Sequence, residues 1–395
     1  MKKNLNLYLY IGARFTSLSG DIVFNLFVVT FFYLSTGSAF KTSLVLVAGA
    51  LPSILFGRPA AGAIDRLNLK RAMALSDFFR FAVLAVLAFL PHTTALFYAA
   101  VFLIGCGGVL FEPASGKIFA RIVHKDELVR GNSLVSLVDN VVKIIVPMLG
   151  GASFLVFDVT GAFLFNAASF LVSGLLVLCI SAPVEGRAAA GATAAAAGAR
   201  LPREFWPLVV FPGLFALLNG VNIAALPPFA FTDLAVSKAQ FALFFSTAGA
   251  GLLLGSLASA MLAKRFSSPF IVRLGLLLLG ATWAGYFLFR DLFLVLALRL
   301  IGSAAISMYF IHFRSFLQVR VEDSLLGKVL AYGQSAASVM MLAGVFAGGL
   351  LAERCSGSVA YLSAGLLAGA AALAAGGLLE QFSPPVSRLA GDAAR

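Results

Sequence analysis

Long apolar segments separated by short polar or basic breaks run along the whole chain. They predict twelve apolar helices, near residues 7–33, 40–63, 73–90, 95–115, 131–156, 159–181, 205–230, 239–262, 270–289, 292–313, 328–351 and 359–379. Each segment is close to the roughly 20 apolar residues that a helix needs to cross a bilayer. The strands of a membrane barrel would alternate between apolar and polar residues, and this alternation is absent. We therefore expect an all-α polytopic membrane protein.

Composition narrows the class of protein further. Hydrophobic residues make up 61% of the chain and charged residues 12%, whereas an average soluble domain is about 45–50% apolar and about 25% charged. A soluble enzyme, a DNA-binding protein and a disordered chain are thereby excluded. The three cysteines and three histidines share no short spacing, so no disulfide, metal site or cofactor is expected. The sequence contains no phosphate-binding loop and no nucleophile–base pattern, so neither ATP hydrolysis nor enzyme activity is expected.

The net charge of +12 follows the expected membrane topology. If the N-terminus lies in the cytoplasm, 20 of the 29 Lys and Arg residues fall in cytoplasmic segments and 4 in outer loops. Cytoplasmic loops of membrane proteins carry such an excess of positive charge. The charge therefore predicts that both termini are cytoplasmic, and it does not indicate nucleic acid.

A small-residue segment flanked by prolines divides the chain. Residues 183–204 are expected to be a cytoplasmic linker between a bundle at 1–182 and a second bundle at 205–395. An offset of 198 residues aligns Gly57 with Gly255 and Asp21 with Asn219. The chain is thus expected to form two six-helix bundles with pseudo-two-fold symmetry around one central path.

Three stretches carry a family resemblance. The first predicted helix contains Arg14-Phe15 and Gly20-Asp21, the loop at 61–71 reads AGAIDRLNLKR, and residues 146–151 read VPMLGG. Together they resemble the major facilitator superfamily, in particular its drug and siderophore exporter branch. Ala61, Asn68, Leu69 and Val146 depart from the family motifs, and Val101 stands near the place of an arginine found in many proton antiporters.

The resemblance implies the major facilitator fold and transport by alternating access. It also implies a conformational gate, in which the loop carboxylate engages the end of a neighbouring helix in one state. The residues matching the gate motifs are Asp65, Arg66, Arg71, Asp77, Pro147, Gly150 and Gly151.

Polar side chains interrupt the predicted helices at few positions. A charge at the centre of a bilayer costs about 2.5–3.5 kcal/mol on insertion scales, so each one needs a partner, a cavity or a function. The candidates for contact with substrate or protons are Arg14, Asp21, Asn25, Glu112, Asp139, Lys143, Asn219, Asn222 and Arg299.

Helical spacing groups some of these candidates. Arg14, Asp21 and Asn25 share one face of the first predicted helix. Asp21 either takes up a proton or binds a cationic group, or it forms a structural pair with Arg14 or another buried cation. Asp139 and Lys143 have the i, i+4 spacing of a pair on one helix. That pair is either a switch that exchanges partners or a self-neutralised pair.

The remaining candidates also keep two interpretations each. Glu112 is either a proton acceptor at the mouth of a cavity or a gate paired with a cation such as Lys117. Arg299 either attracts an anionic substrate group or extends towards the outer interface. Asn219 and Asn222 either contact substrate or form hydrogen bonds between helices.

These features favour a proton-coupled exporter of a small amphiphilic molecule, such as a drug, siderophore or secondary metabolite. Asp21, Asp139 or Glu112 would carry the proton. Two alternatives stay open, namely an importer or uniporter on the same fold and a lipid flippase or scramblase. The expected partners are the substrate, protons and the lipid bilayer, with no nucleic acid. The protein is expected to be a monomer in the bacterial cytoplasmic (inner) membrane.

The loop motif generates the first testable prediction. Asp65→Asn should slow transport while substrate binding survives, because a carboxylate at a helix N-terminus stabilises one conformation by about 0.3–1 kcal/mol and forms no part of the binding site. Transport rate and equilibrium binding are measured on the same preparation. Lost binding with a normal conformational cycle would contradict this role.

Overall fold

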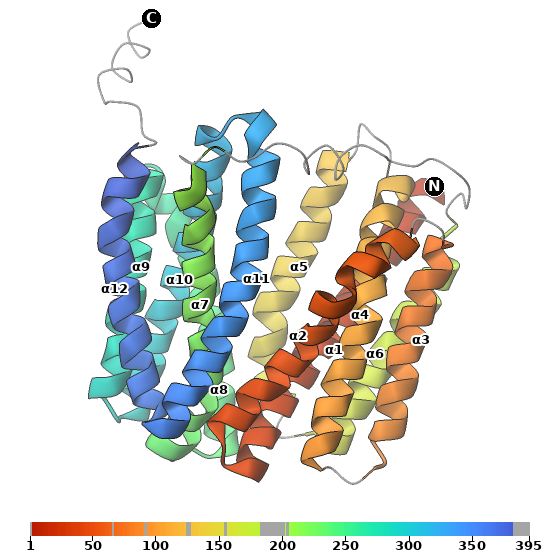
Figure 1. Cartoon of the computed structure of the whole chain (residues 1–395), viewed down its shortest axis with the longest axis horizontal. Helices are drawn as coiled ribbons and strands as arrows, with labels where there is room; N and C mark the ends of the chain where they lie inside the picture. Colours follow the sequence, from red (N-terminus) through yellow and green to blue (C-terminus); the bar gives the residue numbers. More distant parts are fainter. Residues whose placement is uncertain are drawn as a thin grey trace, which may run out of the picture. The chain divides into compact units, whose positions relative to one another are not determined.

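The computed structural model describes residues 2–64, 67–90, 93–123, 128–153, 156–181, 202 and 205–381. Within these ranges the chain is helical and forms no β-strand (Figure 1). The helices are α1 (Lys2–Thr36), α2 (Ala39–Ile64), α3 (Leu69–Leu87), α4 (Thr94–Ile122), α5 (Leu128–Ser153), α6 (Val159–Cys179), α7 (Trp206–Pro228), the π-helical turn η4 (Phe229–Asp233), α8 (Lys238–Leu262), α9 (Ser268–Leu288), α10 (Leu292–Arg320), α11 (Asp323–Arg354) and α12 (Gly357–Gln381).

The prediction of an all-α chain of twelve long helices is confirmed. Among the described residues, 10 helices are long and apolar enough to cross a membrane. Helix α3 lies outside this group because it carries four charged residues, Lys70, Arg71, Asp77 and Arg80. Several side chains of α5 lie outside the described residues. Two of the α3 charges, Asp77 and Arg80, belong to the candidate site.

The helices form two compact units. Unit 1 contains α1 to α6 together with residues 237–246 at the start of α8, and unit 2 contains α7, η4, the rest of α8 and α9 to α12. The predicted linker at 183–204 lies, apart from Pro202, outside the described residues. The two bundles predicted on either side of it stay a prediction.

Unit 1 is built around α6 and α4. Helix α6 packs against both α1 and α3, while α4 packs against α2 and α3 (Figure 1). Buried aromatic rings fill the space between these helices, with Phe24 and Phe97 both contacting Phe163 edge to face. This packing brings the polar residues of α1, α3, α4 and α6 towards one another.

Unit 2 is held by a close approach of α7 and α11. A Cβ atom added at Gly344 would lie 2.0 Å from the carbonyl oxygen of Leu217, and one added at Gly220 would lie 2.3 Å from that of Met341. The two backbones therefore touch where only glycine leaves room, as is common in membrane helix pairs. Helix α12 packs against α9 and α7, and α10 packs against α9.

Local sequence signals mark several helix boundaries. Asn68, Asp158 and Asp291 precede α3, α6 and α10, and each side chain accepts a hydrogen bond from a backbone N–H in the first turn. Helix α1 ends before Gly37, whose φ of +64° is accessible to glycine at little cost. Helix α7 passes through Pro227 and Pro228 directly into η4, a π-helical segment of the kind often found at functional sites.

The α7–α11 contact makes a prediction about stability. Gly344→Ala should destabilise the protein by about 1–3 kcal/mol, because the added methyl group collides with backbone that cannot move aside. Gly369→Ala in α12 is the control, since a Cβ atom there meets nothing within 4 Å. Thermal unfolding in detergent should show a lower midpoint for Gly344→Ala alone, and equal midpoints would contradict the packing account.

Candidate functional site

A buried ion pair within α3 forms the centre of the first charge cluster. Asp77 and Arg80 stand three residues apart, and Nη2 of Arg80 donates to a carboxylate oxygen of Asp77 at 2.5 Å. The other carboxylate oxygen of Asp77 accepts a hydrogen bond of 2.6 Å from the Ser173 hydroxyl of α6. The Arg80 guanidinium carbon also lies 4.8 Å from the ring centre of Phe111 and 4.2 Å from that of Phe170. The face of an aromatic ring attracts a cation. The positive charge of Arg80 is therefore largely balanced by groups within unit 1.

Asp21 is the loosely held member of this cluster. Its carboxylate lies 4.0 Å from Nη1 of Arg80 and accepts a 3.4 Å hydrogen bond from the Asn166 amide. Hydrogen bonds between charged groups are normally about 2.7–2.9 Å long. Asp21, Asp77 and Arg80 together carry a charge of −1 when all are ionised. The carboxylate with spare capacity to accept a proton or a cation is Asp21.

The second cluster is centred on Arg14 and also contains two carboxylates for one arginine. The Arg14 guanidinium holds both carboxylate oxygens of Asp139, at 2.8 and 2.9 Å. Glu112 pairs with the same guanidinium at 3.6 Å, and its side chain is 68% exposed. One arginine thus again serves two carboxylates, and Glu112 is the weakly held one.

These contacts decide between several of the sequence interpretations. The i, i+4 pair predicted within α5 is wrong, because Asp139 reaches across to Arg14 on α1 while the Lys143 side chain is exposed. The cation that contacts Asp21 is Arg80 of α3, and Glu112 is paired with Arg14. Tertiary packing places an arginine beside each carboxylate, and arginine can hold a carboxylate at two points where lysine cannot.

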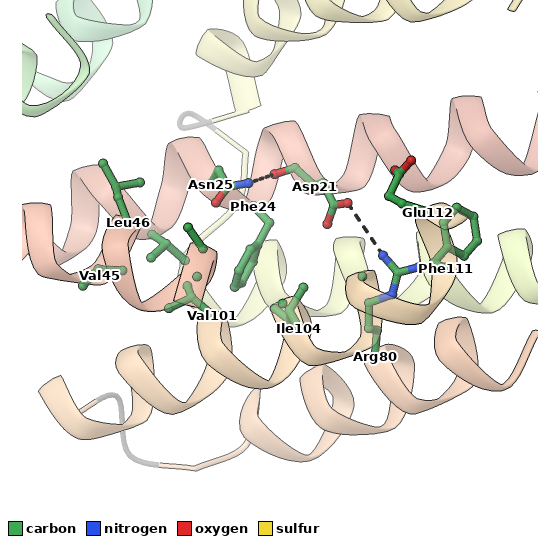
Figure 2. A pocket seen from close by; sticks show the side chains of 15 residues that line it. Asp21, Phe24, Asn25, Val45, Leu46, Arg80, Val101, Ile104, Phe111 and Glu112 are labelled. Carbon is green, nitrogen blue, oxygen red and sulfur yellow. Dashed lines mark hydrogen bonds and ion pairs between the residues drawn. The ribbon is translucent and has the colours of Figure 1, made fainter. Parts of the chain in front are cut away.

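A cavity of about 360 Å³ opens beside both clusters. Figure 2 shows Asp21 and Arg80 facing each other at its wall, joined by a dashed line, with Glu112 nearby. The weakly held carboxylates, Asp21 and Glu112, both line this cavity. The rest of the wall is mostly apolar and comes from α1, α2 and α4, including Phe24, Val28, Val45, Leu46, Val101, Ile104 and Phe111.

Two glycines leave room for the polar cluster. A Cβ atom at Gly107 would lie 2.5 Å from Cγ of Arg80, so the arginine side chain crosses α4 at a residue that has no side chain. A Cβ atom at Gly20 would lie 2.0 Å from the Ser169 hydroxyl and 2.4 Å from the Asn166 amide oxygen. Gly20 therefore lets α6 approach the backbone next to Asp21.

Asn25 lines the cavity and contacts the backbone of Asp21, not its carboxylate. Its amide nitrogen donates to the backbone oxygen of Asp21 at 2.8 Å (Figure 2). Helix α1 is continuous over Arg14, Asp21 and Asn25, so the three residues share one face as predicted. Asp21 and Asn25 line the cavity, and Arg14 pairs with Asp139 and with Glu112 of the wall.

Unit 2 contains a separate buried polar network. The Tyr361 hydroxyl of α12 donates to the Asn222 amide oxygen of α7 at 2.9 Å. Arg299 of α10 is 8% exposed and lies beside the buried Tyr361 and Tyr286 of α9. Arg299 therefore does not extend to the outer interface, and Asn222 makes an interhelical hydrogen bond. Asn219 is half-buried on the same helix.

The residues of the predicted gate are only partly described. Asp65 and Arg66 lie outside the described residues. The Arg71 side chain is exposed in the first turn of α3, and its backbone N–H donates to Asn68. Asp77 is fully buried between Arg80 and Ser173, as part of the first cluster. Pro147 is half-buried in α5, and the surroundings of Gly150 and Gly151 lie outside the described part.

Sequence reasoning missed Arg80 and the α6 residues Asn166 and Ser173 as members of the site. The i, i+3 spacing of Asp77 and Arg80 was a visible signal for the pair. Nothing in the sequence placed α6 beside Asp21. Among the described residues, no group of three His, Cys, Asp or Glu side chains is arranged to hold a metal ion.

Comparisons with known proteins agree on one family. A family model described as transmembrane secretion effector matches residues 17–387. The MFS-type transporter YfiS of Bacillus subtilis (strain 168) is 27% identical over 353 residues, which are 84% of this chain and 82% of YfiS. The MFS-type transporter YkuC of the same organism is 24% identical over 300 residues, 70% of this chain and 69% of YkuC.

Solved structures share the fold at low sequence identity. A bacterial homologue of the human lysosomal transporter Spinster has a TM-score of 0.72 at 16% identity, covering 96% of this chain and 99% of that one. A bacterial homologue of the iron transporter ferroportin has the same TM-score at 14% identity, with the same coverage. Both were captured in inward-facing states.

The unequal contacts of the first cluster predict unequal effects on stability. Asp77→Asn should lower the free energy of unfolding by about 3–5 kcal/mol, because it leaves the buried Arg80 without its close partner. Asp21→Asn should lower the free energy of unfolding by about 1 kcal/mol or less, since the ion pair of Asp21 is long and 30% of its side chain is exposed. Thermal unfolding of both variants measures the difference, and an equal loss would contradict the assignment of Asp21 as the loosely held carboxylate.

Proposed function

This chain belongs to the transmembrane secretion effectors of the major facilitator superfamily, and on that premise we propose that it is a proton-coupled exporter of a small amphiphilic molecule. The family makes it a multi-pass membrane transporter with a small-molecule substrate. Direction, coupling and substrate class are the proposed part. The family description as a secretion effector supports outward movement.

The observation that carries the proposal is the surplus carboxylate in each cluster. Arg14 serves Asp139 and Glu112, and Arg80 serves Asp77 and Asp21. A net negative charge inside a membrane protein is costly, on the order of 2.5–3.5 kcal/mol per charge on insertion scales. Uptake of one proton, or of one cationic group, relieves that cost in either cluster.

The geometry supports a division of roles among the four carboxylates. Asp77 and Asp139 are held at 2.5–2.9 Å by arginine, and so they keep the arginines buried and neutralised. Asp21 and Glu112 line the cavity with long contacts, and so they exchange protons with it. Of the three carriers expected from the sequence, we therefore retain Asp21 and Glu112 and give Asp139 a structural role.

A proton at Asp21 would also change the contacts between helices. Neutral Asp21 no longer attracts Arg80 of α3, so the link between α1 and α3 weakens on protonation. In alternating access, such a charge-dependent link favours one state when protonated and the other when ionised. The membrane potential adds about 2.3 kcal/mol for each charge that crosses 100 mV, which is sufficient to bias the cycle.

Reconstituted transport tests the proposal directly. Purified protein in liposomes with an imposed pH gradient is given a panel that spans the charge classes: tetraphenylphosphonium, progesterone and a catecholate siderophore. At least one compound should move with the gradient, and Asp21→Asn should lower that movement by about tenfold, as expected for loss of a group that transfers protons. Asp139→Asn should act mainly by lowering the amount of folded protein.

Asp158→Asn is the matched control. Asp158 is exposed at the start of α6, outside the cavity wall, and Asn caps a helix as well as Asp. This variant should transport normally. Movement that ignores the pH gradient would favour a uniporter, lipid movement without a gradient would favour a flippase or scramblase, and either result would overturn the coupled mechanism.

A further inference from the structure

We propose that the cavity of unit 1 binds a hydrophobic molecule bearing one positive charge, such as an amine or a quaternary ammonium or phosphonium ion. This substrate class rests on the proposed function, because the cavity is taken as the place where the exported molecule binds. An anionic substrate such as a catecholate siderophore would be excluded.

The size and lining of the cavity suit an amphiphilic molecule. Its volume of about 360 Å³ falls at the small end of drug-binding pockets, which span roughly 300–1,000 Å³. Two aromatic rings, Phe24 and Phe111, and the aliphatic residues Val45, Val101 and Ile104 surround the apolar part (Figure 2). A ligand that gains by leaving water fits these walls.

The charge that remains exposed to the cavity is negative. The wall contains two carboxylates, Asp21 and Glu112, and one guanidinium, that of Arg80. Arg80 is 4% exposed, paired with Asp77 at 2.5 Å and covered on its faces by Phe111 and Phe170. Its positive charge is therefore directed into the protein, whereas the carboxylates of Asp21 and Glu112 are 30% and 68% exposed.

Few hydrogen-bond donors of the cavity wall are available to bind an anion. The Asn25 amide nitrogen already donates to the Asp21 backbone oxygen. Nε of Arg80 has no hydrogen-bond partner in the described structure. That atom faces α4, however, because a Cβ atom added at Gly107 would lie 3.2 Å from it. The accessible acceptors thus outnumber the accessible donors, which is the arrangement that a cation requires.

Opposite-charge probes of the same shape test this inference. Binding of radiolabelled tetraphenylphosphonium to the purified protein in lipid nanodiscs is measured by scintillation proximity, with tetraphenylborate as the nearly isosteric anion. The cation should bind saturably. Asp21→Asn should weaken its binding by about tenfold or more, and Glu112→Gln by less, because a solvent-exposed charge attracts weakly. Asp158→Asn should leave binding unchanged.

A second pair of variants tests the cavity without altering charge. Gly108 lines the cavity, and Gly116 lies two turns further along α4 outside the wall. A Cβ atom at either position meets nothing within 4 Å, so both tolerate a side chain. Gly108→Leu should abolish binding of tetraphenylphosphonium by filling the cavity, whereas Gly116→Leu should leave it intact.

Binding and transport separate the inference from the proposed function. Equally tight saturable binding of tetraphenylborate in a separate sample, or unchanged cation binding in both Asp21→Asn and Gly108→Leu, would overturn the cation site. Proton-driven transport of progesterone or of the siderophore alone would support the exporter and also overturn the cation site. Saturable, Asp21-dependent binding without gradient-driven transport would support the site and contradict the coupled exporter.

Discussion

The organisation of unit 1 depends on the cost of burying charge beside a membrane. Two arginines are buried or partly buried there, and each is shared by two carboxylates. One carboxylate of each pair is held closely and neutralises the arginine, so the arginine can stay away from water. The other carboxylate is left with long contacts at the wall of a cavity. The surplus negative charge is thereby placed where a proton or a ligand can reach it, and the transport proposal follows from that placement.

The packing of unit 1 is arranged around these groups. Arg80 crosses α4 at Gly107 and lies over the rings of Phe111 and Phe170, and Gly20 admits Asn166 and Ser169 of α6 to the side of α1. Helix α3 falls outside the apolar spans because it carries four charged residues, two of which form the central ion pair. Unit 2 differs, since its polar groups Arg299, Tyr361 and Asn222 are joined in a buried network. The surplus carboxylates thus belong to the N-terminal half, whereas these three residues of unit 2 have structural roles.

Much of the fold was predictable from local sequence. Helix length and the distribution of apolar residues depend on positions close in the chain, and so each of the twelve helices was predicted. Their ends differ by up to seven residues, because α4 and α10 continue into polar and basic sequence beyond their apolar segments. The pairing of charges was less predictable, because it depends on which helices become neighbours. The spacing of Asp139 and Lys143 suggested a pair on one helix, yet Arg14 lies 125 residues away in sequence and offers two donors to Asp139. The spacing of Arg80 from Asp77 was a local signal for their pair, but the role of Arg80 required the positions of α4 and α6.

Infrared spectroscopy distinguishes carboxylates that exchange protons from those that stay ionised, because a protonated carboxyl group absorbs separately from an ionised one. Difference spectra between acidic and alkaline pH are recorded for the wild type and for single variants of the four carboxylates. The account predicts that the signal of proton exchange is reduced in Asp21→Asn and in Glu112→Gln, and that it persists in folded Asp77→Asn and Asp139→Asn. A signal that survives in both Asp21→Asn and Glu112→Gln would contradict the assignment of the exchanging carboxylates.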